Sequence, residues 1–239
     1  MNGLPRVVTI AWCLTDASAR GPARRLSHAA ITAAAIEVAD DQGLGAVTMA
    51  RVAQRLGFTT MALYRYVSTK AELLLLMADA AVALPDLKVE RGEGASGLRR
   101  WADAVRDAHR AHPWLAEVPR ASTSAMMPNS ARMTDLALRA LDGLPLTAPE
   151  KLATVLALSG LAAFYADVER SMAAEPTEAI DPDALAPFVG ALAASCPDVA
   201  ALTASGEFVN TTGADDSWVE QQYAFSVAAL LAGLPSAAE

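Results

Sequence analysis

Gly57 separates two short segments that each have the pattern of an amphipathic helix. Thr48 precedes the first segment, residues 49–56, and Thr59 precedes the second, residues 60–67. A threonine hydroxyl at this position can accept a hydrogen bond from a free amide of the first helical turn. Glycine readily adopts the left-handed backbone of a sharp turn. The two segments are therefore predicted to form a helix-turn-helix, whose second helix is free to enter a groove of duplex DNA.

Helical patterns continue on both sides of this motif. Ser27 is predicted to cap a helix over residues 28–41, and Thr69 with Glu72 forms the capping box of a helix that runs to about residue 84. No series of alternating strands is found, so the predicted fold class is all-α. The further predicted helices span residues 98–111, 113–118, 129–141, 148–172, 181–194, 197–204 and 218–234.

Charge is distributed unevenly along the 239 residues, whose net charge is −8. Residues 1–70 hold 8 Lys and Arg against 4 Asp and Glu, a balance of +4, while residues 71–239 hold 11 against 23, a balance of −12. This division predicts a small cationic module that can approach phosphates, joined to an acidic body that phosphates repel.

Other function classes lack their sequence signatures. Cys13 and Cys196 have no metal-binding spacing, and His109 and His112 lack a third ligand in register. Residues 92–97 read GxGxxG, but they follow a helix pattern rather than the buried strand that a dinucleotide site requires. We therefore expect no catalytic residues, no metal and no cofactor, and the chain is not predicted to be an enzyme.

The apolar runs also bear on where the chain is found. The run near the amino terminus is at the short end of what a secretion signal needs. The strongly apolar run at residues 73–77 is interrupted by Asp79 and ended by Pro85 before it reaches the length of a membrane span. We expect no membrane contact and a reducing, cytoplasmic location.

The sequence LGFTTMALYRYVSTKAEL, residues 56–73, resembles the tetracycline-repressor (TetR) family of bacterial transcription regulators. The resemblance extends over residues 24–84, and a weaker pattern at residues 112–115 is similar to the ligand-binding half of that family. It implies an Ω-shaped, all-α homodimer that binds a palindromic double-stranded DNA operator and releases it when a small-molecule effector enters the second domain. The expected parts are a flexible amino-terminal extension (1–23), a helix-turn-helix DNA-binding domain (24–84) and a helical ligand-binding and dimerisation domain (85–239).

The same resemblance implies which residues contact DNA. Residues 60–62 begin the helix that resembles the base-reading element, and Tyr64, Tyr66 and Lys70 match phosphate-contacting positions, although most members carry histidine where this chain has Tyr66. Hydroxyls, cationic groups and helix-terminal amides are suited to phosphate oxygens. The predicted DNA-binding residues are Arg24, Arg25, Thr48, Thr59, Thr60, Met61, Ala62, Tyr64, Arg65, Tyr66 and Lys70.

A pocket for the effector is expected among the helices of the larger domain. Methionine and tryptophan side chains suit an adaptable site, so the effector is predicted to be apolar or aromatic. For each of these residues, packing in the core is an alternative role. The predicted lining residues are Trp101, His109, Trp114, Met127, Met133, Phe164 and Tyr165.

Two long helices are predicted to form the dimer interface. Residues 148–172 and 218–234 are apolar on two sides, so one side can face the core and the other a second copy. Alternatives remain open at this point: a repressor, an activator or a co-repressor-dependent regulator of the same family, a helical adaptor for another protein, or an all-α small-molecule-binding protein or enzyme.

Overall fold

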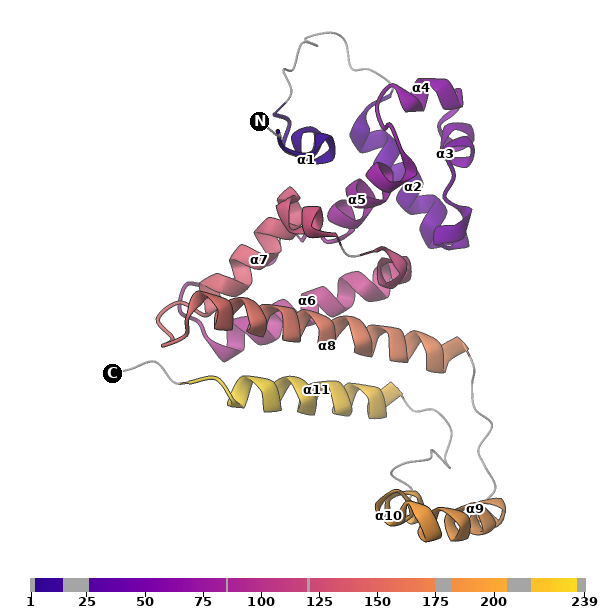
Figure 1. Cartoon of the computed structure of the whole chain (residues 1–239), viewed down its shortest axis with the longest axis vertical. Helices are drawn as coiled ribbons and strands as arrows, with labels where there is room; N and C mark the ends of the chain where they lie inside the picture. Colours follow the sequence, from indigo (N-terminus) through magenta and orange to yellow (C-terminus); the bar gives the residue numbers. More distant parts are fainter. Residues whose placement is uncertain are drawn as a thin grey trace.

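The computed structural model describes residues 3–14, 26–84, 86–119, 121–174, 182–205 and 216–235. These residues form helices and no strands, so the predicted all-α class is confirmed (Figure 1). The α-helices are α1 (Arg6–Ala11), α2 (His28–Gln42), α3 (Met49–Leu56), α4 (Thr60–Tyr64), α5 (Lys70–Ala81), α6 (Ala95–Ala111), α7 (Pro128–Ala140), α8 (Ala148–Ala174), α9 (Pro182–Ser195), α10 (Pro197–Ala204) and α11 (Asp216–Ala232). Short 3₁₀ turns are η1 (Leu44–Ala46), η2 (Pro113–Glu117) and η3 (Ser122–Met126).

Hydroxyl side chains start the helices of the amino-terminal domain, as predicted. Ser27, Thr48, Thr59 and Thr69 each accept a hydrogen bond, 3.1–3.3 Å long, from the amide three residues further along. Between α3 and α4, Gly57 has φ of 73° and ψ of 29°, which is the left-handed conformation. The caps and this turn set α3 and α4 at an angle, which is the predicted helix-turn-helix.

The amino-terminal helices pack around one apolar core. Ile31 of α2, Val52 of α3, Leu63 of α4 and Leu73 of α5 are all fully buried in it. Because burial of apolar surface is the main stabilising contribution to folding, these contacts hold the short helices α3 and α4 in place.

Residues 6–11 form helix α1 and are not the loose extension that the sequence analysis predicted. Val7 and Val8 are buried in the same core as α2–α5, and Arg6 forms an ion pair with Glu72 of α5. The remainder of the predicted extension, with Arg24 and Arg25, lies outside the described residues. Two smaller differences are that α4 ends at Tyr64 and α5 at Ala81, each three residues earlier than predicted.

The larger carboxy-terminal part has a second core. Helix α8 lies beside both α6 and α11, and α7 packs across α6 and α8 (Figure 1). Leu98, Leu158 and Tyr223 are fully buried where these helices meet. Helices α9 and α10 pack against each other at the end of the molecule furthest from α2–α5 (Figure 1).

One side of α8 and α11 remains apolar and exposed. Phe164 of α8 is 60% exposed and Phe225 of α11 is 72% exposed. By length and composition α8 could cross a membrane. In this structure it packs on α6 and α11, and 22% of its most apolar stretch is buried within the protomer. An apolar face of this extent is typical of an interaction surface.

Replacing the turn glycine is expected to destabilise the protein. In Gly57→Ala the new Cβ meets no atom within 4 Å, but an alanine is strained at φ of 73°. The free energy of unfolding should fall by about 1–2 kcal/mol. Urea denaturation would measure this, with Gly45→Ala as the matched control because Gly45 also has open space but no positive φ. Equal effects of the two substitutions would contradict the role given to the turn.

Candidate nucleic-acid interface and ligand cavity

Helix α4 presents several of the predicted DNA-contacting side chains to solvent. Met61 is 75% exposed and Tyr64 is 45% exposed, while Leu63 on the opposite side is fully buried. Thr60 and Ala62 are half-buried. The short helix is therefore anchored by Leu63 and free on its outer side, as a helix that enters a groove must be.

The remaining predicted contacts surround α4. Thr48 and Thr59 lie exposed at the amino-terminal ends of α3 and α4, and Arg65 and Lys70 are exposed at the connection to α5. Tyr66 is half-buried, and its ring meets that of His28 edge-on at 5.5 Å between centroids. The structure thus brings the described members of the predicted set to one end of the molecule.

The carboxylates near this surface are all engaged by other groups. Two of them pair with Arg55, a third pairs with Arg6, and the last two accept hydrogen bonds from the larger carboxy-terminal part. The five carboxylates of residues 26–84 are Glu37, Asp41, Glu72, Asp40 and Asp79, in the same order.

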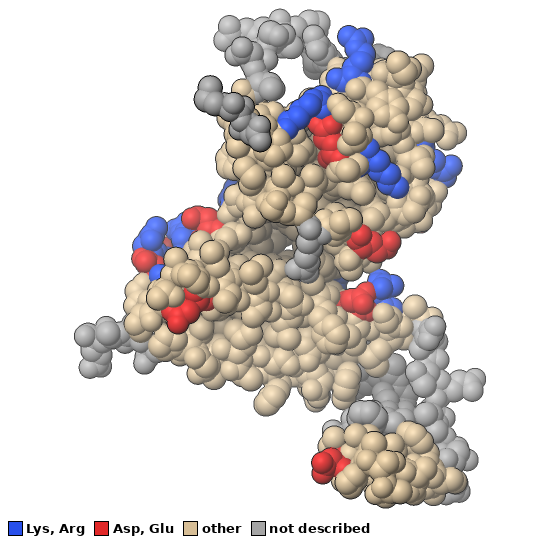
Figure 2. All heavy atoms as spheres, in the orientation of Figure 1, with Lys and Arg blue, Asp and Glu red and all other residues tan. Residues whose placement is uncertain are grey.

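Among the residues that the structure describes, two cations near α4 lack a carboxylate partner. Arg65 and Lys70 form no ion pair with any of the described residues. On the face shown in Figure 2, several Lys and Arg side chains lie over the end of the molecule that carries α2–α5. Uncompensated positive charge on an exposed helix surface favours phosphate as a partner.

Asp79 connects the amino-terminal domain to the larger part of the protein. Its buried carboxylate accepts hydrogen bonds from the backbone amides of Asn129 and Ser130 at 3.0 and 2.9 Å, and from both of their side chains at 3.0 and 3.1 Å. A side chain of α5 therefore caps the amino-terminal end of α7, where free amides and the helix dipole favour negative charge.

A second carboxylate, Asp40 of α2, makes a similar connection. It accepts hydrogen bonds from the indole Nε1 of Trp114 at 2.6 Å and from Nδ1 of His112 at 2.9 Å. These contacts hold η2 against the amino-terminal domain. The pairing also gives His112 a partner other than a metal, and no group of three or more metal-ligating side chains occurs in the part of the chain that the structure describes.

A cavity of about 350 Å³ lies next to the residues that form these two connections. Its walls come from α5, α6, α7 and α8 and from the segment that contains η2 and η3. Two of its lining residues are Ala78, which directly precedes Asp79 in the sequence, and Ser130, which donates hydrogen bonds to Asp79. The cavity is mostly apolar with a few hydroxyl groups, which is typical of a site for a small organic molecule.

Three of the seven predicted lining residues meet at this cavity. Trp101 and His109 of α6 and Met133 of α7 line it, and the Trp101 indole N–H donates to the Met133 carbonyl at 2.7 Å. The cavity residues that sequence reasoning missed are mainly alanine, serine, threonine and valine, such as Ala108 and Thr134. Nothing in the helical pattern distinguishes these from ordinary packing residues.

The other four predicted lining residues lie elsewhere. Trp114 and Met127 are buried in the amino-terminal core, because the segment between α6 and α7 turns toward that domain. Phe164 is on the exposed side of α8, and the Tyr165 hydroxyl hydrogen-bonds Ser226 of α11 at 2.9 Å. These four residues therefore do not line this cavity, since residue type and helical spacing do not show which side chains face it.

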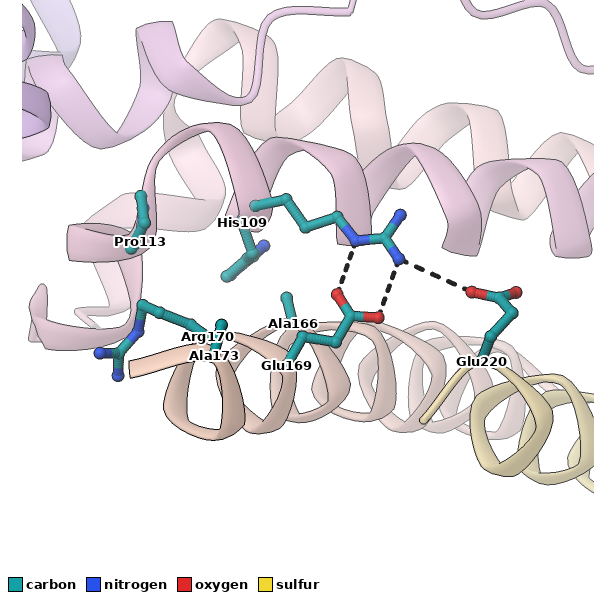
Figure 3. A pocket seen from close by; sticks show the side chains of 8 residues that line it. His109, Pro113, Ala166, Glu169, Arg170, Ala173 and Glu220 are labelled. Atoms are coloured by element: carbon teal, nitrogen blue, oxygen red, sulfur yellow. Dashed lines mark hydrogen bonds and ion pairs between the residues drawn. The ribbon is translucent and has the colours of Figure 1, made fainter. Parts of the chain in front are cut away.

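A second, larger cleft of about 670 Å³ is lined by charged groups (Figure 3). Arg110 of α6 forms ion pairs with Glu169 of α8 at 2.7 Å and Glu220 of α11 at 3.6 Å. Behind them Arg106, 2% exposed, contacts the same two carboxylates and stacks on the Tyr223 ring at 3.9 Å. This network joins α6, α8 and α11.

The surroundings of this network shift the pKa values of two of its members. Burial acts to raise the pKa of Glu169, but hydrogen bonds from Arg110 and Arg106 outweigh it and hold the pKa below its ordinary value. Burial, together with the hydrogen bond to Asp103, raises the pKa of Tyr223. Glu169 therefore remains ionised at neutral pH, and its contacts stabilise the helical body.

Replacing Glu169 by glutamine should make the free energy of unfolding depend less on pH in the acidic range. A carboxylate with a lowered pKa contributes stability above its unfolded value, near pH 4.5, and loses it as the pH falls through the folded value. Glu169→Gln should cost about 1–2 kcal/mol at pH 7 and less at pH 4. Urea denaturation across pH, with the exposed Glu117→Gln as control, measures this. Parallel curves for the wild type and Glu169→Gln would contradict the assignment.

Comparison with known proteins gives a family match within the amino-terminal domain and one curated relative over a longer part of the chain. The family model "Bacterial regulatory proteins, tetR family" matches residues 31–77, which span most of α2 through most of α5. The HTH-type transcriptional repressor DrrR1 of Streptomyces coeruleorubidus is 31% identical over 159 residues, which are 66% of this chain and 58% of the relative. The chain therefore spans less than two thirds of the length of that curated relative.

Solved structures of similar fold are also found. ActR of Streptomyces coelicolor in complex with actinorhodin has a TM-score of 0.63 at 24% identity, with 89% of this chain and 99% of ActR covered. BioQ with its double-stranded DNA operator has a TM-score of 0.52 at 22% identity, with 61% of this chain and 88% of BioQ covered. At these identities the likeness establishes the fold.

Proposed function

We propose that this chain, whose residues 31–77 match the model of the tetR family of bacterial regulatory proteins, is a cytoplasmic, ligand-responsive transcriptional regulator of that family without catalytic activity. It binds a palindromic DNA operator as an Ω-shaped homodimer and is released by a small-molecule effector. Repression is favoured over activation because the relative DrrR1 is named a repressor. Residues 24–84 serve as the DNA-binding domain and residues 85–239 as the ligand-binding and dimerisation domain.

The observation that carries this proposal is the exposed side of α4 together with Arg65 and Lys70, two nearby cations that form no ion pair within the part of the chain that the structure describes. Met61 and Ala62 can contact thymine methyl groups, and Thr60 and Tyr64 offer hydroxyl groups. Arg65 and Lys70 lie within six residues of α4 and can bind the flanking phosphates, since no carboxylate of the described residues forms an ion pair with them. An enzyme or a helical adaptor has no need for this arrangement.

Removal of two proposed phosphate contacts should weaken DNA binding and reduce its dependence on salt. A duplex selected by the wild-type chain from a random pool serves as the operator. The double variant Tyr64→Phe, Lys70→Gln should bind at least several-fold more weakly, with the slope of log K against log salt reduced by about one. Fluorescence anisotropy across a series of KCl concentrations measures both quantities.

The matched control for this experiment is Lys88→Gln, which removes the same charge from an exposed lysine between α5 and α6. Its affinity and salt slope should equal those of the wild type. Equal behaviour of the double variant and the control would reject the proposed surface.

The proposed effector site is the cavity of about 350 Å³ between α5, α6, α7 and α8. Trp101 and Met133 give it an apolar, polarisable lining, so we propose an apolar or aromatic effector. A ligand that fits one arrangement of these walls better than another shifts the position of α5 through the Asp79 contact. The spacing of two reading helices, which must match successive grooves about 34–36 Å apart, then changes.

The two cavities can be separated by one substitution in each. Ala125→Phe places a ring in the proposed effector cavity, and Ala173→Phe places the same ring in the charged cleft. The probe is 8-anilinonaphthalene-1-sulfonate, a fluorescent dye with an apolar aromatic part and one sulfonate. Ala125→Phe should lower its affinity about tenfold or more, since the new ring occupies the volume of the dye's aromatic part. Dye titration measures the effect. Loss of binding in Ala173→Phe alone would assign the site to the charged cleft.

We propose that a second copy covers the exposed apolar side of α8 and α11. Phe164 and Phe225 lie on this side, and a four-helix contact across a two-fold axis would bury them. Two copies held in this way present two α4 helices to one palindrome.

A further inference from the structure

Helix α1 is docked on the DNA-binding domain at the connection between α4 and α5. Arg6 Nη2 donates a hydrogen bond to the Tyr66 carbonyl at 3.0 Å, and Arg6 Nη1 forms an ion pair with Glu72. The other Glu72 oxygen accepts a hydrogen bond from the Ser68 amide at 2.8 Å. Arg6 therefore holds both ends of the short connection that follows the reading helix.

The docking of α1 is supported by apolar burial. Val7 and Val8 are 7% and 2% exposed, and both belong to the core that α2–α5 form. At the other end of α1, the Trp12 indole N–H donates to the Met126 carbonyl at 2.7 Å. Ser124 and Ala125 of η3 line the effector cavity. Residues 6–12 therefore extend from the connection after the reading helix to the 3₁₀ turn that forms part of the cavity wall.

The contacts of Arg6 argue against a direct role on DNA. Its guanidinium faces a carboxylate that is itself 9% exposed, so the positive charge is already compensated. The Tyr66 carbonyl that it binds also receives a contact from His28 Nε2 at 3.0 Å, which leaves this backbone fixed from two sides. Lys70 and Arg65, at the two ends of this connection, form no ion pair with a residue in the described ranges.

We propose that residues 6–12 are a positioning element for the DNA-reading helix and that Arg6 is its positioning residue. Through Glu72 and the Tyr66 carbonyl, Arg6 fixes the turn between α4 and α5 and thereby the direction of Arg65 and Lys70 toward phosphates. This inference rests on the proposed DNA-binding function. It assigns a role in operator affinity to a segment outside the helix-turn-helix.

The test is a double-mutant cycle of Arg6→Gln and Glu72→Gln in the full chain, with the duplex selected by the wild type. Each single variant should lose about tenfold in affinity, and the double variant should lose clearly less than the product of the two single losses, because the Arg6–Glu72 contact is common to both substitutions. The salt slope should equal that of the wild type, because Arg65 and Lys70 still reach their phosphates in the complex and only the free energy of ordering the turn is lost. Arg6→Lys, which keeps the charge but not the planar fork, should be intermediate.

Arg91→Gln is the matched control, since Arg91 also pairs with one carboxylate, that of Asp142, but on the larger part of the protein. It should bind like the wild type. Additive losses in the cycle, or a salt slope reduced by about one in Arg6→Gln, would instead make Arg6 a DNA contact and overturn the proposal. Unchanged affinity in Arg6→Gln would overturn it as well.

Hydrogen exchange separates this inference from the proposed function. In Arg6→Gln the Ser68 amide should exchange several-fold faster, while amides of α8 keep their wild-type rates, because the bracing contact of Glu72 is weakened locally. If the wild-type chain selects no duplex, the proposed function fails, and this measurement still decides whether Arg6 braces the turn. Unchanged exchange at Ser68 would refute the brace itself.

Discussion

The capping of α7 by Asp79 is the contact on which the arrangement of the two parts depends. An apolar interface between helices tolerates sliding, but a carboxylate that accepts four hydrogen bonds from Asn129 and Ser130 fixes both distance and direction. Its burial at 5% exposure makes any loss of these bonds costly. Ser130 itself and the chain neighbour of Asp79 also line the cavity. A change in the cavity walls is therefore coupled to the position of α5.

Features that depend on local chemistry could be predicted from the sequence. The caps Thr48 and Thr59, the turn at Gly57 and the spacing of apolar residues located the helix-turn-helix and the later helices to within a few residues. Helix α1 could not be found in this way. It has six residues, too few to be stable alone, and it exists because Val7 and Val8 are buried and Arg6 meets Glu72, 66 positions away.

The cavity illustrates the same limit. Trp101, His109 and Met133 were predicted by residue type, but Trp114 is equally apolar and packs elsewhere, since Asp40, 74 positions earlier, binds its indole. Residue type indicates that a side chain is buried and not which neighbours bury it. The assignment of the DNA contacts remains a prediction, because it follows from the resemblance and from exposure.

The threonine caps have a further chemical property. At Thr48 and Thr59 the hydroxyl oxygen accepts a bond from a backbone amide, so its hydrogen is left to donate outward. Accepting one bond polarises the O–H and strengthens the bond it gives. A phosphate oxygen needs such a donor, whereas aspartate, an equally good cap, would present negative charge to it. The same atom can thus begin a helix and bind the polyanion, a combination open to serine and threonine but closed to the carboxylates.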